Sequence, residues 1–213
     1  MNIRLQSHFF WGPYGPFSAL TGAGLFVMAS VRFSYAVVCA GAFLWVFCMT
    51  ALVYYSAGKF LPARGRPVIL LFLSSLLCSI YILLVGFANP LLIYRIWFFM
   101  IMIPPCCMGA GLFTGMDSEP KADILSRVWL EALSYGLILI AFSLIREPLG
   151  TGALSLPGGP WGFFEIFWIG GGASGFFPVQ IISIPAGGFI ILGFAVALFR
   201  AMRSRQSIAG DES

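Results

Sequence analysis

Few residues in this sequence could do chemistry: five cysteines, a single histidine and eight acidic side chains. Two of the cysteines, Cys106 and Cys107, are adjacent and directly follow Pro104 and Pro105. The other three lie inside hydrophobic stretches, where a free thiol packs as a small apolar group. We find no glycine-rich phosphate loop after a strand, no nucleophile with a base, no histidine pair and no carboxylate dyad. The chain is therefore not expected to catalyse covalent chemistry alone.

The composition predicts an integral membrane protein. Of the 213 residues, 60% are hydrophobic and 9% are charged, whereas soluble domains are about 45–50% apolar and about 25% charged. So few charged side chains cannot cover the surface of a soluble fold of this size. The composition excludes a soluble enzyme, a nucleic-acid-binding module and a disordered chain.

Six stretches are predicted to cross a bilayer, which needs about 20 apolar residues per helix. The first is short, and the fifth contains Glu131 near its start. In chain order they are Phe17–Val31, Phe33–Ser56, Val68–Ala88, Ile96–Met116, Val128–Ile145 and Pro178–Phe199. A five-helix alternative would place the first stretch in the membrane interface.

The basic residues predict the orientation of these six helices. Nine lie on the side of the two termini, and three, Arg32, Arg95 and Arg146, lie on the other side. Because cytoplasmic segments are enriched in lysine and arginine, both termini are expected in the cytoplasm, with the protein in the inner membrane.

The first and fourth predicted spans share a five-residue sequence motif. Gly22–Phe26 reads Gly-Ala-Gly-Leu-Phe, and Gly109–Phe113 repeats it. A chance recurrence is one explanation, and a three-plus-three duplication with inverted copies is the other. The predicted fold is an all-α membrane protein with two inverted three-helix repeats. We assign the repeats to 17–90 and 91–203, with an interfacial lead-in at 1–16 and a polar tail at 204–213.

The first and fourth helices are predicted to be broken into half-helices. Proline lacks an N–H and clashes with the preceding turn, so Pro104 and Pro105 should interrupt the fourth helix near mid-depth. The freed backbone groups must be buried in protein or line a site. Glycines let another backbone or a cofactor approach closely. The candidate cofactor-binding residues are therefore the four repeat glycines, Gly22, Gly24, Gly109 and Gly111.

Two charged motifs flank the fifth span: Met116-Asp-Ser-Glu-Pro120 and Ile145-Arg-Glu-Pro-Leu-Gly-Thr-Gly-Ala-Leu154. Together with six helices, two of them broken, these motifs resemble membrane subunits D and E of the Na⁺-pumping NADH:quinone oxidoreductase (Nqr) and of the Rnf complex. The resemblance covers nearly the whole chain. It implies a membrane subunit of an ion-translocating electron-transport complex, paired with an inverted homologous subunit. In that family the pair binds a binuclear iron–sulfur cluster at mid-membrane, using one cysteine from the first and one from the fourth segment of each subunit.

The sequence departs from the family pattern at these cysteines. Phe17–Val31 contains none, and Pro105 stands at the expected position in the fourth segment, directly before Cys106 and Cys107. Ligation of an iron–sulfur cluster by Cys106 and Cys107, shared with a partner subunit, is one expectation. It is awkward because neighbouring helical residues point about 100° apart. A cofactor-free scaffold is the other expectation.

The segment after the fifth span is expected at the outer membrane interface. Arg146 would snorkel to the lipid headgroups beside Glu147, or the two charges would fasten the next loop or a partner. The loop at 150–177 is rich in glycine and aromatic residues, and a short surface helix is expected over Phe163–Ile169.

Transport is the main alternative function. A small inverted-repeat transporter or channel would bind an ion or solute at the half-helix breaks, but the nearby polar residues are only Ser18, Thr21 and Thr114. The expected partners are the lipid bilayer and other membrane subunits of a redox complex, with no nucleic acid.

Overall fold

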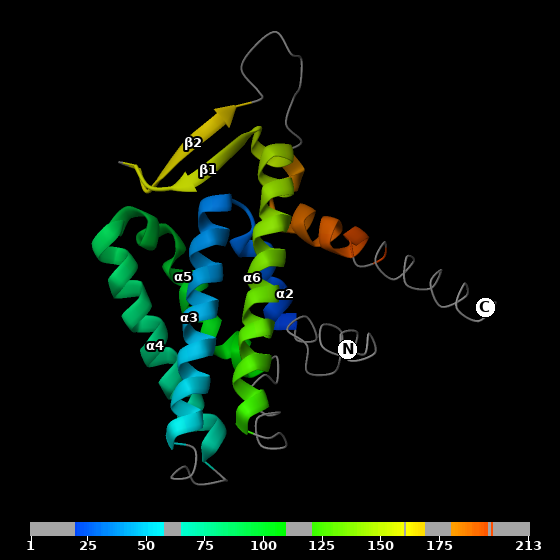
Figure 1. The fold of residues 1–213 in the computed structure, drawn as a ribbon. Coiled ribbons are helices and arrows are strands. Elements are labelled where there is room, and N and C mark those ends of the chain that lie inside the picture. Colours follow the sequence, from blue (N-terminus) through cyan, green and yellow to red (C-terminus); the bar gives the residue numbers. More distant parts are fainter. Residues whose placement is uncertain are drawn as a thin grey trace, which may run out of the picture.

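A computed structural model of the chain describes residues 20–57, 65–109, 121–159, 161–168, 180–195 and 197. Helices, a two-stranded hairpin and a short 3-10 helix follow one another along these residues (Figure 1). In order they are α2 (Leu20–Ala29), α3 (Phe33–Ala57), α4 (Arg66–Ala88), α5 (Pro90–Gly109), α6 (Lys121–Thr151), β1 (Ala153–Pro157), β2 (Phe163–Trp168), η3 (Gln180–Ile182) and a helix over Pro185–Ala195.

Four helices are long and apolar enough to cross a membrane. These candidate spans are Phe33–Ala57, Arg66–Ala88, Pro90–Cys107 and Val128–Thr151, and their mean hydropathies range from 1.6 to 2.8. Large apolar side chains also cover their outward faces; on α4, Phe72 is 72% exposed. Contiguous apolar surface of this kind is suited to lipid. The chain is therefore a multi-pass membrane protein.

Helix α3 lies at the centre of the bundle (Figure 1). It packs along α6 and against α4, and α4 packs against α5. Along the α3–α6 contact, the ring of Phe43 stacks on Tyr135 with centroids 4.2 Å apart. A Cβ on Gly136 would lie 3.4 Å from the Cβ of Ala40. Small residues let membrane helices approach closely, so Gly136 and Ala40 allow α3 and α6 to pack against each other.

The first and last predicted crossings are not shown as spans. The described part of helix α2 has ten residues, about 15 Å of helix, which by itself does not span a hydrocarbon core of about 30 Å. The Pro185–Ala195 helix is also short, and in Figure 1 it points away from the α3–α6 bundle. Six crossings, the inverted repeats and the orientation in the membrane remain predictions.

The predicted break at Pro104 and Pro105 is wrong, because α5 continues through both prolines to Gly109. Proline at position 104 removes the N–H that would bond the carbonyl of Met100, one turn earlier. The thiol of Cys78 on α4 donates a hydrogen bond to that same carbonyl at 3.2 Å. A neighbouring helix thus supplies the donor that the proline lacks, and α5 stays helical.

The expected surface helix over Phe163–Ile169 is also wrong. Residues Phe163–Trp168 form β2, which pairs antiparallel with β1. Gly158, Gly159 and Gly162 in the connecting turn have φ values of 136°, 77° and 92°, a region that favours glycine. The hairpin lies across one end of the bundle (Figure 1), and we call this the hairpin end.

The three arginines that the sequence predicts on one side of the membrane all lie at the hairpin end. Arg32 follows α2, Arg95 lies in the second turn of α5, and Arg146 lies near the end of α6. Arg66 begins α4 at the opposite end of the bundle. The described arginines are therefore sorted between the two ends as the sequence predicted.

Candidate functional site

Arg146 and Glu147 form the most unusual polar site in the described residues, because both are buried. Their exposed fractions are 1% and 2%. The expectation that Arg146 snorkels to the headgroups is therefore wrong, and its side chain lies inside the protein. A charged group is stable in such a place only when hydrogen bonds replace its water.

The guanidinium of Arg146 donates to oxygen atoms from two chain segments that are far apart in sequence. One segment is the end of α2 and the turn after it; the other is η3 and the turn that leads into the last helix. The acceptors are Ser30 Oγ at 2.7 Å, the carbonyl of Val27, and the carbonyls of Ile182, Ser183 and Ile184 at 2.9, 3.3 and 3.0 Å. Five donors are all that a guanidinium has. A cation beside the carbonyl end of α2 also matches the helix dipole.

Glu147 has the complementary role at the start of α3. Its Oε2 atom accepts a hydrogen bond from the backbone N–H of Phe33 at 2.8 Å and from that of Ser155 at 3.1 Å. Phe33 is the first residue of α3, where N–H groups lack partners within the helix and negative charge is favoured. The Ser155 hydroxyl donates to Ser34 Oγ at 3.1 Å. Glu147 therefore joins α3 to strand β1.

Glycines let the surrounding segments approach Arg146 and α6. A Cβ on Gly188 would lie 2.7 Å from Arg146 Cζ, and one on Gly150 would lie 3.0 Å from the backbone nitrogen of Ser183. Gly152 ends α6 with a φ of 73°, and its N–H donates to the carbonyl of Pro148 at 3.0 Å. Helices often end with a glycine in this conformation. The motif from Arg146 to Gly152 is therefore a junction that fixes α2, α3, the hairpin and η3 to α6.

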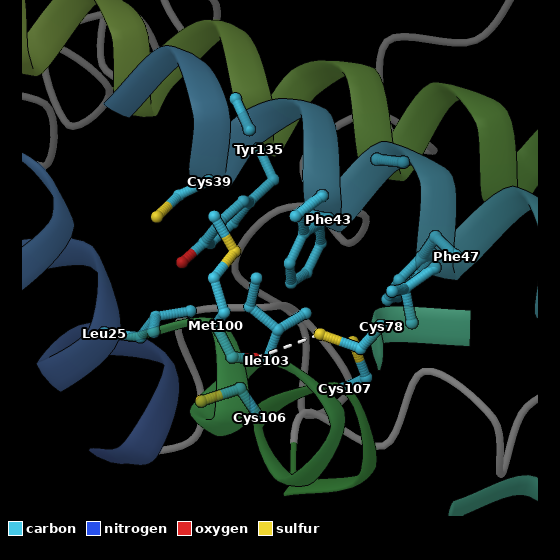
Figure 2. Close-up of a cluster of buried hydrophobic side chains, with 14 of the residues drawn as sticks. Leu25, Cys39, Phe43, Phe47, Cys78, Met100, Ile103, Cys106, Cys107 and Tyr135 are labelled. Atoms are coloured by element: carbon cyan, nitrogen blue, oxygen red, sulfur yellow. Dashed lines mark hydrogen bonds between the residues drawn. The ribbon is translucent and has the colours of Figure 1, made fainter. Parts of the chain in front are cut away.

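The adjacent cysteines do not converge on one point. Cys106 is 5% exposed and Cys107 is fully buried. In Figure 2, Cys107 lies next to Cys78, while Cys106 points toward the side of α2. No group of three or more His, Cys, Asp or Glu side chains in the described ranges could hold a metal ion. A cluster shared with a partner needs thiols at a surface, so the described residues do not fit one.

Among the four repeat glycines, Gly24 is the one whose surroundings the structure describes. A Cβ on Gly24 would meet no atom within 4 Å, so close approach does not require glycine there. Gly22 lies in α2 and Gly109 ends α5. Gly111 lies outside the described residues.

Sequence reasoning missed the burial of Arg146 and Glu147 and the part that Ser155 has in their network. The available signal was the spacing of Arg146, Glu147, Gly150 and Gly152, which combines two opposite charges with glycines at the end of a helix. In the comparisons with known proteins, no family model and no curated protein matches this chain.

Proposed function

We propose that this chain is a non-catalytic membrane subunit of an Rnf/Nqr-type ion-translocating electron-transport complex. One observation carries the proposal: α2 and α5 pack against each other and run in opposite directions (Figure 1). Helix α2 contains the first copy of the Gly-Ala-Gly-Leu-Phe motif, and α5 ends at the first residue of the second copy. An alternating order of helices makes the first and fourth antiparallel, and their direct contact agrees with two inverted three-helix repeats.

Within that complex, the chain has a supporting role. All five donors of Arg146 are used within the chain, and the two adjacent cysteines are buried in its own core. The exposed apolar faces of α4 and α5 are available to lipid and to other membrane helices. The expected partners are an inverted homologous subunit and redox subunits that hold the cofactors.

Transport by this chain alone is less well supported. A transporter of this architecture needs polar groups where its first and fourth helices meet. The buried side chains described within α2 and α5 are apolar or cysteine, from Leu25 on α2 to Cys107 on α5. A dry contact of this kind favours a scaffold over a hydrated pathway.

Gentle purification of the tagged protein from its native membrane, followed by electron paramagnetic resonance, tests this proposal. We expect redox partners to co-purify, and we expect Cys106→Ala and Cys107→Ala to leave any iron–sulfur signal unchanged. Loss of the signal in either variant would make that cysteine a ligand and reject the supporting role. A lone colourless oligomer that takes up a solute in liposomes would reject the redox complex altogether.

A further inference from the structure

Two arginines meet at one aromatic ring at the hairpin end. Arg32 Cζ lies 4.1 Å from the ring centroid of Phe163, and Arg95 Cζ lies 5.3 Å from it. Arg32 comes from the turn between α2 and α3, Arg95 from α5, and Phe163 begins β2. Contacts between a cation and the face of a ring are attractive and hold the guanidinium in place. Three separate elements thus bring two cations together on one small surface.

This surface keeps a net positive charge. Glu165 pairs with Arg32 at 3.7 Å between Oε1 and Nη1, and the two side chains are 48% and 28% exposed. Ion pairs this long and this exposed are weak. Arg95 is exposed and forms no ion pair with a carboxylate in the described part of the chain, so it adds a positive charge to this surface.

An apolar face of α5 continues from Arg95 toward the middle of the bundle. Phe98 and Met102 lie three and seven residues after Arg95, and helical residues at these spacings share a face. Their exposed fractions are 49% and 37%. A cation at the end of a membrane helix with an apolar stripe beside it matches a lipid, with its charged head and its chains.

We propose that Arg32 and Arg95 bind the phosphate of an anionic phospholipid whose acyl chains lie along Phe98 and Met102. The planar guanidinium matches phosphate oxygens with paired donors. Phe163 orders both arginines before the lipid arrives, which reduces the loss of side-chain freedom on binding. Free phosphate shares the headgroup chemistry, but only a lipid also covers the apolar stripe.

Native mass spectrometry of the detergent-purified protein tests this site, with phosphatidylglycerol and phosphatidylcholine added in equal amounts. We expect the wild type to bind phosphatidylglycerol preferentially. Each arginine near a membrane surface contributes roughly a 5-fold gain in affinity for anionic lipid, so Arg32→Gln and Arg95→Gln should each weaken the preference by about that factor. Glu165→Gln removes a carboxylate that would repel the negatively charged phosphate. This variant should therefore strengthen the preference for phosphatidylglycerol.

Arg66→Gln is the matched control. Arg66 also contacts a ring, that of Tyr54 at 5.7 Å, but it lies at the opposite end of the bundle. We expect this variant to keep the wild-type preference for the first bound lipid. An equal loss in Arg66→Gln, no preference in the wild type, or no gain in Glu165→Gln would overturn the site. Displacement of the lipid by millimolar inorganic phosphate would assign a soluble anion instead and also overturn the proposal.

Discussion

Replacement of Arg146 by methionine removes the guanidinium but keeps an unbranched side chain that still fills space. The variant loses all five hydrogen bonds that hold the end of α2 and the residues after η3 to α6. Two of the acceptors, the carbonyls of Val27 and Ile184, still receive a hydrogen bond in the variant. The Ser30 hydroxyl donates to the first, and the N–H of Gly188 donates to the second. The remaining loss is therefore spread over both segments rather than concentrated at one atom.

The expected destabilisation follows from the number of bonds. Side-chain hydrogen bonds between membrane helices contribute about 0.6 kcal/mol on average and about 1.7 kcal/mol at most, so five of them amount to about 3 kcal/mol and at most about 8.5 kcal/mol. For a chain of this size, a loss of that order lowers the melting temperature by more than about 6 °C. Arg146→Lys should fall in between, because lysine keeps the charge but has three donors on one nitrogen.

The assay is the melting temperature in detergent, measured as the monodisperse fraction in size-exclusion chromatography after heating. Arg95→Met serves as the control, because Arg95 is an exposed arginine at the same end of the bundle whose contact with the ring of Phe163 contributes only about 0.5–1 kcal/mol. A shift of less than about 2 °C for Arg146→Met would refute the reasoning that the buried network holds this end together.

Three further predictions use the same assay. Glu147→Ala leaves two backbone N–H groups without their acceptor and should destabilise the protein by about 2–4 kcal/mol, whereas Glu147→Gln, which keeps an acceptor, should lose less; equal losses would contradict this. Cys78→Ala should lower the free energy of unfolding by about 1 kcal/mol. The loss should be much smaller in a Pro104→Ala background, because residue 104 then donates its own N–H to the carbonyl of Met100. Strictly additive effects would show that the thiol does not compensate for the proline. Gly188→Ala, whose Cβ would press on the guanidinium, should destabilise by about 1–3 kcal/mol, and Gly24→Ala, with open space around it, should not; similar effects in both would reject the close packing.

The long helices could be predicted from sequence because lipid imposes a length and a composition. The predicted span from Phe33 to Ser56 ends one residue before α3 does. The predicted fourth span begins at Ile96, six residues after the start of α5, because the charge of Arg95 bounds the uncharged stretch on its N-terminal side. A local signal was present there: Asn89 precedes Pro90, and its Oδ1 accepts from the N–H of Leu92 at 3.2 Å. This is a helix start with an N-cap and a proline in the first turn.

The hairpin was also predictable in principle. Residues Ala153–Pro157 alternate between buried and less buried positions, and a glycine-containing turn leads to the aromatic run of β2, a pattern typical of hairpins. The aromatic composition of Phe163–Ile169 instead predicts an interfacial helix. Aromatic side chains suit both settings, so composition alone favours neither.

The site itself could not be derived from local sequence. Arg146 meets the carbonyl of Val27 across 119 positions and that of Ile182 across 36. Whether a charge at a helix end points to water or to protein depends on which distant chain ends meet there. Snorkelling needs no partner and is the usual outcome, whereas burial here depends on two distant segments whose oxygen atoms converge on the guanidinium.

The proposed role of this chain is to support a redox complex by pairing with an inverted homologue. Quantitative mass spectrometry of the protein, purified under mild conditions from its native membrane, tests this pairing. We predict near-equimolar recovery of a homologous membrane subunit of opposite topology, together with flavin- or iron–sulfur-bearing subunits. Recovery of this chain alone, or only with copies of itself, would rule out the proposed role.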